Sequence, residues 1–298
     1  MNPEAALPAI ERAIRDAVGE NFRVRSREEA SGGCIHRSFA VSDGDSRFFV
    51  KLNDVTALPM FAAEADGLAA IAATGTFRTP TVVTCGHEGQ HAYLILEHVD
   101  IRPLRSAADG ERFAETLAQM HRATGKRFGW HRDNFIGSTP QTNTPMDNWA
   151  HFFGRCRLQP QFTLARANGF TGEIQQRGER LINRLGALFL DYHPQPALLH
   201  GDLWHGNAGV TESGEPVVFD PAVHYGDSES DLAMSELFGG FPTVFYATYR
   251  KAAALDVGYE ARKPLYSLYH ILNHLNLFGR GYLGEALRLT IRLSDAIS

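Results

Sequence analysis

The chain has 298 residues, of which 44% are hydrophobic and 21% charged, an ordinary composition for a globular protein. Its net charge is -5, which disfavours a free-standing nucleic-acid binder, because such proteins usually carry a basic excess. No apolar run approaches the roughly 20 residues that span a bilayer, so we expect no membrane segment. The three cysteines form no C-x-x-C pair, which argues against a disulfide framework or a zinc cluster.

The first residues predict an amphipathic helix. Apolar and charged residues alternate at helical spacing over 1–20, unlike a secretory signal, and we expect a cytoplasmic protein. Asn2 is the expected N-cap and Pro3 the first helical residue. The residues expected on the apolar face of this helix are Leu7, Ile10, Ile14 and Ala17.

A small mixed domain rich in short strands follows this helix. Asp43-Gly44 predicts a hairpin turn, and a helix is expected from about Pro59 to Ala73. Strands are expected at about 22–29, 35–42, 47–52, 81–85 and 92–99.

From about residue 105 the pattern becomes mostly helical, with a loop-and-hairpin region at 198–221. We therefore expect an α+β, two-lobed fold, with a small β-rich lobe at 1–98 and a mostly helical lobe at 99–298. A ligand site is expected at the junction of the lobes. Helices are expected at about 111–124, 147–166, 172–191, 230–238, 242–255 and 261–297.

The strongest chemical signal is the run HGDLWHGN at 200–207, followed by an apolar strand that ends in Asp220. Phosphoryl transfer needs a base for the acceptor hydroxyl and metal ions on the phosphates. Asp202 and Asn207 have the same separation as the base and the metal-binding Asn in the kinase loop H-R-D-x-x-x-x-N. Together with Asp220, they predict a base and two oxygen ligands for Mg²⁺ beside ATP. The alternative, a surface Asp and Asn in a turn, is disfavoured by the strand-end Asp220.

Parts of a nucleotide site also occur in the N-terminal half. Gly32 and Gly33 of SGGCIHRSF would let backbone N–H groups approach phosphates, although a Gly-Gly turn alone is a weak signal. Lys51 lies near the end of the strand FFVKL, where a kinase holds the lysine that contacts the α- and β-phosphates. Glu64 falls on the apolar face of the next helix, where a carboxylate is costly unless it is paired. An ion pair between Lys51 and Glu64 explains both residues.

The strand AYLILEHVD at 92–100 joins the two lobes. Its end could offer backbone groups around Glu97 and Val99 to an adenine ring. An ordinary core strand is the alternative, and the sequence does not separate the two, because backbone recognition leaves no side-chain signature.

With these parts assembled, the chain resembles the fructosamine-3-kinase (ketosamine-3-kinase) family, in the aminoglycoside- and choline-kinase-like branch of the protein-kinase fold. The resemblance covers essentially the full length. HGD-x-x-x-x-N alone marks the broad small-molecule kinase branch. The runs FGWHRDNFIG at 128–137 and DPAVHYGDSESDLAM at 220–234 are more specific.

The resemblance implies transfer of the ATP γ-phosphate to the O3 hydroxyl of a ketosamine, a sugar adduct on an amine or a protein. The implied role is deglycation repair, with ribulosamines and erythrulosamines as better substrates than fructosamines. It also implies that Asp202 is the base and that Asn207 and Asp220 bind Mg²⁺. Lys51, oriented by Glu64, would contact the phosphates.

Two departures from protein kinases matter. Gly201 stands in place of the Arg of H-R-D, and no A-P-E follows Asp220. A kinase gated by phosphorylation is therefore disfavoured. A protein could still be the carrier of the sugar adduct.

Four residues are weaker candidates for the acceptor site. Trp204 is expected to form an apolar wall against the sugar, with packing inside its own loop as the alternative. Trp130 and Asp133 shape the acceptor site or belong to a structural turn, with neither favoured. Asp227 stays open between binding an amine stem and a structural role. Asp231 is expected to cap the following helix or to brace the catalytic loop.

Cys34 follows the two glycines, where nearby N–H dipoles favour a thiolate. One hypothesis is redox control, by oxidation of Cys34 or by a Cys34–Cys34 bridge between two chains. A small buried side chain in a monomer is the alternative.

Two other classes of function remain. The first is a related kinase for an aminoglycoside, a macrolide, choline or homoserine, which HGD-x-x-x-x-N equally permits. The second is a nucleotide-binding regulatory pseudokinase, which usually lacks a base, a metal ligand or the lysine. Because this chain has all of them, catalysis is favoured.

Overall fold

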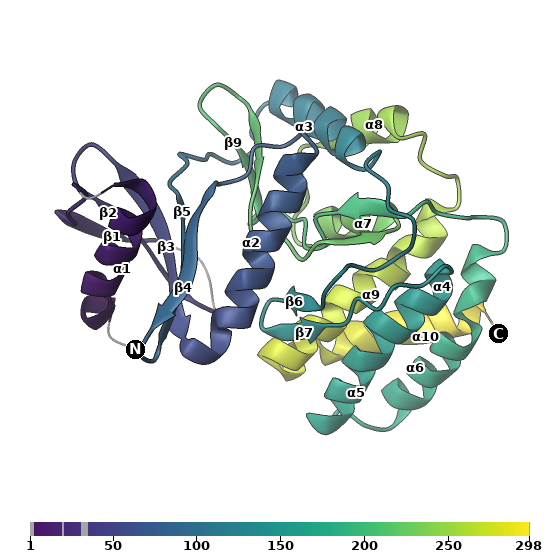
Figure 1. The fold of residues 1–298 in the computed structure, drawn as a ribbon. Helices are drawn as coiled ribbons and strands as arrows, with labels where there is room; N and C mark the ends of the chain where they lie inside the picture. Colours follow the sequence, from purple (N-terminus) through teal and green to yellow (C-terminus); the bar gives the residue numbers. More distant parts are fainter. Residues whose placement is uncertain (1–2, 20, 31–34, 298) are drawn as a thin grey trace.

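The computed structural model describes residues 3–19, 21–30 and 35–297, and these residues form two lobes (Figure 1). An antiparallel sheet dominates the first lobe and helices dominate the second, so the expected α+β, two-lobed fold is confirmed. The architecture changes between Glu97, where the sheet ends, and Ala107, where the first helix of the second lobe begins. The division at 98/99 stays a prediction.

The sheet of the first lobe has five strands in the order β1–β2–β3–β5–β4. Its elements are α1 (Pro3–Val18), β1 (Ser26–Glu29), β2 (Arg37–Ser42), β3 (Arg47–Asp54), a 3₁₀ turn (Val55–Ala57), α2 (Leu58–Ala73), β4 (Val82–Glu88) and β5 (His91–Glu97).

Two expectations for this lobe were partly wrong. The first strand begins at Ser26 and not near residue 22, because the chain before it is held by α1: the Val24 N–H donates to Glu11 Oε2 at 3.0 Å. On α1, Ile10 and Ile14 are buried as expected, but Ala17 is exposed. Asn2, the expected N-cap, lies outside the described residues.

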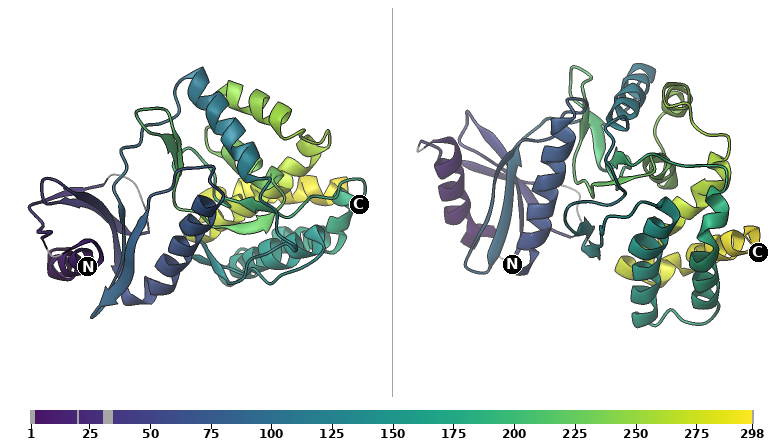
Figure 2. Two further views of the ribbon diagram at one scale, coloured as in Figure 1. Left: turned by 45° about the horizontal axis from the view of Figure 1, so that its top comes forward. Right: turned by 45° about the vertical axis from the view of Figure 1, so that its right-hand side comes forward.

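The helices α1 and α2 cover opposite faces of the five-stranded sheet (Figure 1). Side chains of a strand alternate between faces, and Val50 and Leu52 of β3 pack with Ile10 and Ile14 of α1. Lys51 therefore points to the other face. There α2 lies between the sheet and the second lobe (Figure 2).

The stretch Val55–Ala73, which contains α2, is long and apolar enough to cross a membrane by length and composition alone. This corrects the sequence expectation that no such segment exists. The same composition suits a helix packed between two layers of a fold, and α2 has Phe61 and Leu68 buried against the sheet. Its Glu64 is also buried.

The second lobe is built from helices around a small set of two-stranded ladders. The ladders are β6 (Asn134–Ile136) with β7 (Thr139–Gln141), β8 (Ala197–Leu199) with β11 (His224–Gly226), and β9 (Ala208–Val210) with β10 (Pro216–Val218). The helices are α3 (Ala107–Met120), α4 (Trp149–Phe152), a π-helix (Phe153–Leu158), α5 (Gln159–Ala167), α6 (Glu173–Arg184), a 3₁₀ helix (Leu185–Phe189), α7 (Glu229–Leu237), α8 (Thr243–Ala252), α9 (Tyr259–Phe278), a 3₁₀ turn (Arg280–Tyr282) and α10 (Leu283–Ala296).

The helices after residue 105 lie where the sequence predicts them, with two exceptions. The first, α3, begins and ends four residues earlier than the expected 111–124, and the second is at the end of the chain. The single helix expected over 261–297 is two helices, α9 and α10. Gly279 separates them with a φ of 87°, a left-handed conformation that stops a helix and that glycine adopts readily. The β6–β7 hairpin was not anticipated, because its three-residue strands are too short to show a period.

The start of α3 gives a stability prediction centred on Asp109. Its carboxylate accepts hydrogen bonds from Arg102, at 2.8 and 3.1 Å, and from the backbone N–H of Ser106 at 3.0 Å. In return Ser106 Oγ accepts from the Asp109 N–H, which completes a capping box. The Arg102 hydrogen bond, with these backbone bonds, holds the pKa of Asp109 well below its ordinary range.

We expect Asp109→Asn to lower the free energy of unfolding at neutral pH by about 2 kcal/mol. The folded-state pKa is depressed, so the contribution of the carboxylate is present above the unfolded pKa of about 3.9 and is lost as the pH falls below it. Urea unfolding of both proteins across the acid range measures this difference, which should narrow in acid. Asp147→Asn, at an exposed pair with Arg127, is the control and should change little. Equal stability of the wild type and Asp109→Asn at neutral pH would contradict the prediction.

Candidate active site

Lys51, Glu64 and Asp220 meet between the two lobes. Lys51 Nζ donates to Glu64 Oε1 at 2.6 Å and also donates to Asp220 Oδ1. The ion pair expected between Lys51 and Glu64 is therefore present. It joins β3 to α2, and Asp220 joins both to the second lobe.

The two carboxylates keep Lys51 charged despite its burial. Lys51 is only 5% exposed and Glu64 9%. Burial alone would lower the pKa of Lys51, but Asp220 and Glu64 outweigh it and raise the pKa above its ordinary value. Burial raises the pKa of Glu64, against the attraction of Lys51. A permanently charged ammonium beside a carboxylate suits contact with an anionic phosphate group.

The β9–β10 hairpin places Asn207 beside Asp220. Ala208 pairs with Val218 in the ladder, and the Phe219 N–H donates to the Asn207 carbonyl at 3.1 Å. Asp220 then leaves the strand with a φ of 55°, a left-handed conformation that Asp tolerates better than most residues. Burial would raise the pKa of Asp220, but Lys51 outweighs burial and lowers it, so this carboxylate stays ionised.

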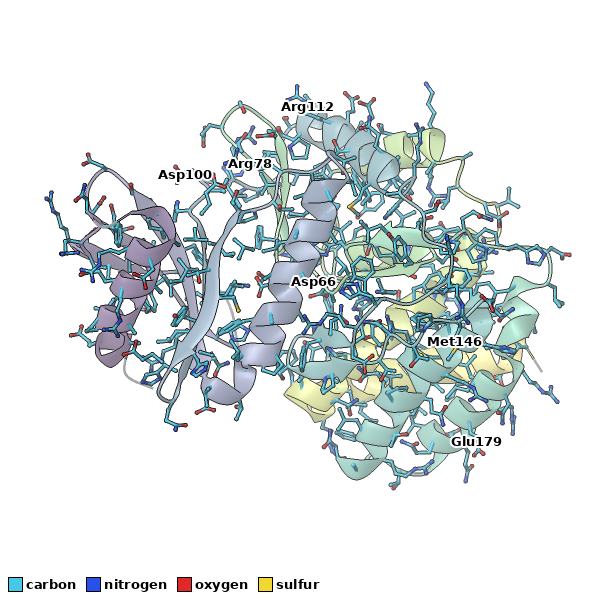
Figure 3. All side chains as sticks on the ribbon, in the orientation of Figure 1. Asp66, Arg78, Asp100, Arg112, Met146 and Glu179 are labelled. Carbon is cyan, nitrogen blue, oxygen red and sulfur yellow. The ribbon has the colours of Figure 1, made fainter. Side chains whose placement is uncertain are left out.

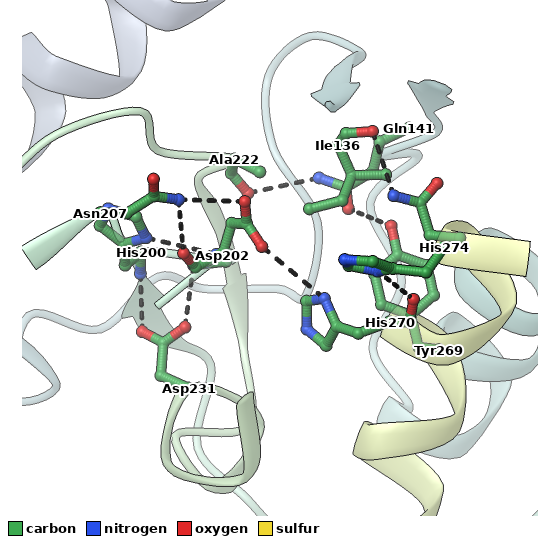
Figure 4. A network of polar contacts seen from close by, with 12 residues as sticks. Ile136, Gln141, His200, Asp202, Asn207, Ala222, Asp231, Tyr269, His270 and His274 are labelled. Carbon is green, nitrogen blue, oxygen red and sulfur yellow. Dashed lines mark hydrogen bonds and ion pairs between the residues drawn. The ribbon is translucent and has the colours of Figure 1, made fainter. Parts of the chain in front are cut away.

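Asn207 also contacts the expected base. Its Nδ2 donates to the Asp202 carbonyl at 2.9 Å and to Asp202 Oδ2 at 3.1 Å (Figure 4). With its amide nitrogen used in this way, the Oδ1 of Asn207 accepts no hydrogen bond from the described residues. A free amide oxygen and an ionised carboxylate, that of Asp220, are hard oxygen donors of the kind that Mg²⁺ prefers. The residues present therefore fit a magnesium ion held with nucleotide phosphates.

Asp202 has the environment of a general base. Its side chain is 22% exposed. Burial, and then the charge of Asp220, raise the pKa of Asp202 to about 7. A carboxylate whose pKa is raised towards neutrality accepts a proton more readily than an ordinary aspartate.

Asp231 of α7 fixes the backbone of the catalytic loop. Its two carboxylate oxygens accept the N–H groups of His200 and Gly201 at 2.7 and 2.8 Å. His121 Nε2 lies 3.2 Å from the same carboxylate. The expectation that Asp231 braces the loop is confirmed. The alternative that it caps a helix is wrong, because α7 begins at Glu229.

Gly201, the residue before the base, has no room for a side chain. Its φ is 83°, and a Cβ atom there would lie 2.1 Å from the carbonyl oxygen of Ala222. That atom belongs to the backbone of the neighbouring chain segment and cannot rotate away. We therefore expect Gly201→Ala to lower the free energy of unfolding by at least about 2 kcal/mol, since strain and overlap add.

Chemical denaturation measures this effect, and Gly284→Ala is the matched control. Gly284 lies in α10 with no atom within 4 Å of the added Cβ. Alanine there should be neutral or stabilising, by up to about 1 kcal/mol. Equal stabilities of Gly201→Ala and the wild type would show that the loop relaxes more easily than its contacts suggest.

The end of β5 has free backbone groups at the position expected to contact adenine. The carboxylate of Glu97 pairs with Arg78 and accepts a hydrogen bond from Thr81 Oγ1 at 2.9 Å. The backbone N–H of Glu97 donates to the Thr81 carbonyl. Glu97 is thus largely engaged. Val99 makes no backbone hydrogen bond with the described residues, so its N–H and C=O are free for a ligand. That the backbone contacts adenine here stays a prediction. Of the two expected positions, Glu97 and Val99, only Val99 has both its N–H and its C=O free of bonds to the described residues.

Gly32, Gly33 and Cys34, the expected phosphate loop and redox residue, lie outside the described residues. The next described residues are Ile35 and His36. The His36 ring contacts Phe61 of α2 with ring centroids 4.8 Å apart. Burial, and then the charge of Lys51, lower the pKa of His36 to about 4. The segment after the glycines thus runs beside the Lys51 site.

Trp204 lies on the catalytic loop, two residues after Asp202, and is partly exposed. One face of its ring covers Gly206, where an added Cβ would lie 2.5 Å from the ring. Phe238 lies at its edge, with centroids 6.2 Å apart. The ring therefore packs on its own loop and keeps some free surface. A wall against the sugar stays a prediction.

Trp130 and Asp133 have structural partners. Trp130 Nε1 donates to Asp66 Oδ2 at 2.8 Å, and Asp66 lies on the side of α2 that faces the second lobe (Figure 3). Asp133 Oδ1 accepts the Asn143 N–H at 2.8 Å. These contacts favour the structural turn. Trp130 fastens α2, and with it Glu64, to the second lobe.

Asp227 is not available to a substrate. It is 0% exposed and accepts hydrogen bonds from Tyr192 at 2.9 Å and Tyr266 at 2.5 Å. Beside it Glu229 holds Arg262 through two hydrogen bonds, at 2.7 and 2.8 Å. The sequence hypothesis that Asp227 binds an amine stem is corrected: the carboxylate belongs to a buried network that ties α7 to α9.

Sequence reasoning missed His270, whose Nδ1 lies 3.8 Å from Asp202 Oδ1. It also missed Asp66 and His121. His121 and His270 reach the site from α3 and α9, and Asp66 meets Trp130 from the other lobe, so no local sequence pattern marks these contacts. A count of buried histidines on α9 would have been a signal only after the helix was placed against the loop.

The fold and this site define a kinase that transfers a phosphoryl group to a hydroxyl group. A family model described as fructosamine kinase matches residues 6–294, and the chain belongs to that family.

The relatives agree with this assignment. The chain is 45% identical over 288 residues to a Synechocystis protein named "Probable ketoamine kinase", covering 96% of both chains. It is 40% identical over 274 residues to a chloroplastic protein-ribulosamine 3-kinase of Arabidopsis thaliana, covering 91% of this chain and 83% of the relative.

Solved structures support the same fold. A crystal structure from Haemophilus somnus, provisionally assigned as a fructosamine-3-kinase, has a TM-score of 0.88 with 29% identity and covers 95% of this chain and 96% of the other. An aminoglycoside phosphotransferase crystallised with ADP and hygromycin B has a TM-score of 0.63 with 16% identity, covering 97% of each chain. At that identity the second structure supports the fold alone.

Proposed function

We propose that this protein uses Mg²⁺-ATP to phosphorylate the O3 hydroxyl of ketosamines, the adducts that sugars form on amines and proteins. The observation that carries the proposal is the meeting of Lys51, Asp202, Asn207 and Asp220 between the lobes. The substrate class comes from the names of its relatives, a ketoamine kinase and a protein-ribulosamine 3-kinase. Deglycation repair is the biological role that this reaction supports.

Each residue has a distinct part in this reaction. Asn207 Oδ1 and the Asp220 carboxylate would hold Mg²⁺, which supplies positive charge to the phosphate oxygens. Lys51, kept charged by Glu64 and Asp220, would contact the phosphates of ATP. Asp202 would accept the proton of the attacking hydroxyl.

Alignment matters more than covalent chemistry here. Asp231 fixes the backbone before Asp202 through the N–H groups of His200 and Gly201. Asn207 holds one oxygen of the Asp202 carboxylate. The base therefore stays oriented before a substrate arrives, which reduces the entropy lost on reaching the transition state.

ADP release measured with a panel of acceptors tests the proposal. The panel contains ribulosyl-lysine, erythrulosyl-lysine, fructosyl-lysine, kanamycin and choline, each with Mg²⁺-ATP. We expect turnover of ketosamines, with ribulosyl- and erythrulosyl-lysine ahead of fructosyl-lysine. Turnover of kanamycin or choline alone would keep the kinase and contradict the substrate class. ATP binding without turnover of any acceptor would favour the regulatory pseudokinase.

Three further expectations stay predictions. The relatives include chloroplast proteins as well as bacterial ones, so the cytoplasmic location is not settled by similarity. The oligomeric state stays a prediction, and the redox hypothesis concerns Cys34, which lies outside the described part of the chain. Non-reducing gels after peroxide treatment would show a Cys34-linked dimer directly.

A further inference from the structure

His270 of α9 points at the catalytic carboxylate from the side opposite Asn207 (Figure 4). Its Nδ1 lies 3.8 Å from Asp202 Oδ1, and the histidine side chain is 5% exposed. This distance is too long for a hydrogen bond. The two groups nevertheless face each other without an intervening side chain in Figure 4.

The Asp202 carboxylate is held at one oxygen only. Asn207 Nδ2 donates to Oδ2 at 3.1 Å, and Oδ1 receives no hydrogen bond from the described residues. A carboxylate fixed at one oxygen can still turn about its Cβ–Cγ bond. A second donor at Oδ1 would fix the plane of the carboxylate, and with it the direction of the lone pair that takes the hydroxyl proton.

His270 has a nitrogen that needs such a partner. Its Nδ1 is buried and bonded to none of the described residues. A buried polar group left in that state is destabilising by about 1–3 kcal/mol. A hydrogen bond to Asp202 would relieve this cost at the histidine and complete the support of the base.

A small cavity, of about 10 Å³, adjoins the ring and is walled by Arg157, Ser230 and His270 among others. Arg157 Nε and Ser230 Oγ are likewise buried with no partner among the described residues, so two further polar atoms in these walls lack a hydrogen bond. Closing 3.8 Å to a bond of about 2.8 Å requires a shift of only about 1 Å.

The protonation state of His270 is suited to donating a hydrogen bond to Asp202. Burial, then the charges of His274 and Arg157, lower the pKa of His270 to about 3, against the opposing charge of Asp231. The imidazole is therefore neutral near pH 7. A neutral donor orients a carboxylate without the positive charge that would lower its pKa and weaken it as a base.

We propose that His270 is a positioning residue for the catalytic base: in the substrate-bound enzyme its Nδ1–H donates to Asp202 Oδ1. Asn207 and His270 then hold the two oxygens of one carboxylate. The inference rests on the proposed function through the role of Asp202 as base, and it does not depend on which ketosamine is the acceptor.

Three variants test it, measured with the best acceptor of the panel. We expect His270→Leu, which has no donor, to lower kcat at least about tenfold with little change in KM for ATP. His270→Asn puts an amide N–H close to the position of Nδ1 and should recover most of that loss. Asn273→Leu on the same helix is the control. Asn273 is buried and bonded to Gln161, so its loss should lower the melting temperature and leave kcat nearly unchanged.

A double variant separates positioning from structure. If His270 acts through Asp202, adding His270→Leu to Asp202→Asn should cause no further fall in kcat. An additional fall of the same size as in the wild type would overturn the inference. So would an unchanged kcat in His270→Leu, or a rise in ketosamine KM alone, which would make His270 a substrate contact.

Nitrogen-15 NMR of the imidazole gives a readout without turnover. With Mg²⁺ and a non-hydrolysable ATP analogue, Nδ1 of His270 should carry the proton, and its signal should shift in Asp202→Asn. Protonation at Nε2 in both proteins would contradict the proposal. If the wild type phosphorylates no ketosamine, the proposed function fails, whereas the NMR result still decides the contact.

Discussion

Asp202→Asn is expected to lower kcat by about 10³-fold, the usual contribution of a positioned general base. Asn has nearly the shape of Asp and can still bond Asn207, so the loop should keep its conformation. ATP binding should change little, because Asp202 is not placed on the phosphates. Steady-state kinetics with the best acceptor, with ATP affinity measured by titration calorimetry, tests both parts.

The stability of this variant is an internal control. Burial and Asp220 disfavour the ionised form of Asp202, so the amide should leave the melting temperature unchanged or raise it. This is the expected trade between stability and activity at a functional site. A kcat within a few-fold of the wild type, in a folded protein, would mean that another group accepts the proton.

Asp220→Asn is expected to lower kcat/KM by about 10³-fold, because it removes the charged oxygen ligand proposed for Mg²⁺ and one of the two carboxylates on Lys51. Asn is chosen because the residue has a φ of 55°, and Asn adopts this left-handed conformation more readily than Ala does. The loss should therefore come from chemistry and not from backbone strain.

The dependence of the rate on Mg²⁺ distinguishes this effect from a general defect. The variant should need a much higher Mg²⁺ concentration for half-maximal activity, and adding Mg²⁺ should not restore the full rate. Glu215→Gln is the matched control, since Glu215 is an exposed carboxylate on the loop between β9 and β10. An Asp220→Asn enzyme with the Mg²⁺ dependence of the wild type would remove Asp220 from the metal site.

The sequence predicts those parts of the site that are carried by local patterns. Lys51 lies near the end of a predicted strand, and helical spacing places Glu64 on the inner face of α2. Because both positions are buried, pairing is the only inexpensive arrangement, and the structure has that pair at 2.6 Å. Asp202 and Asn207 were identified by their separation within one loop.

Contacts between residues that are far apart in the sequence could not be predicted, because they depend on how distant segments pack. His270 meets Asp202 only because α9 crosses behind the catalytic loop, and Trp130 reaches Asp66 across the junction of the lobes. Contacts of this kind also decide between the two roles that the sequence leaves open for Asp227. Tyrosines from other segments donate hydrogen bonds to its carboxylate, which is completely buried.

The predicted ends of helices and strands were wrong where a single residue interrupts a continuous hydrophobic pattern. The apolar period continues from α9 into α10, yet Gly279 in a left-handed conformation divides them. The first strand starts late because a side chain on α1, Glu11, satisfies the backbone of Val24. Both outcomes depend on backbone hydrogen bonding, which the hydrophobic pattern does not encode.

The central claim is that this protein phosphorylates O3 of a ketosamine at the Asp202 site. The most direct test is to incubate it with Mg²⁺-ATP and ribulosyl-lysine and to locate the phosphate in the product by two-dimensional ¹H–³¹P NMR. We predict a phosphorus signal coupled to the proton on C3, equimolar with ADP and absent with Asp202→Asn. A phosphate on another oxygen, or ADP formed without a phosphorylated sugar, would contradict the account.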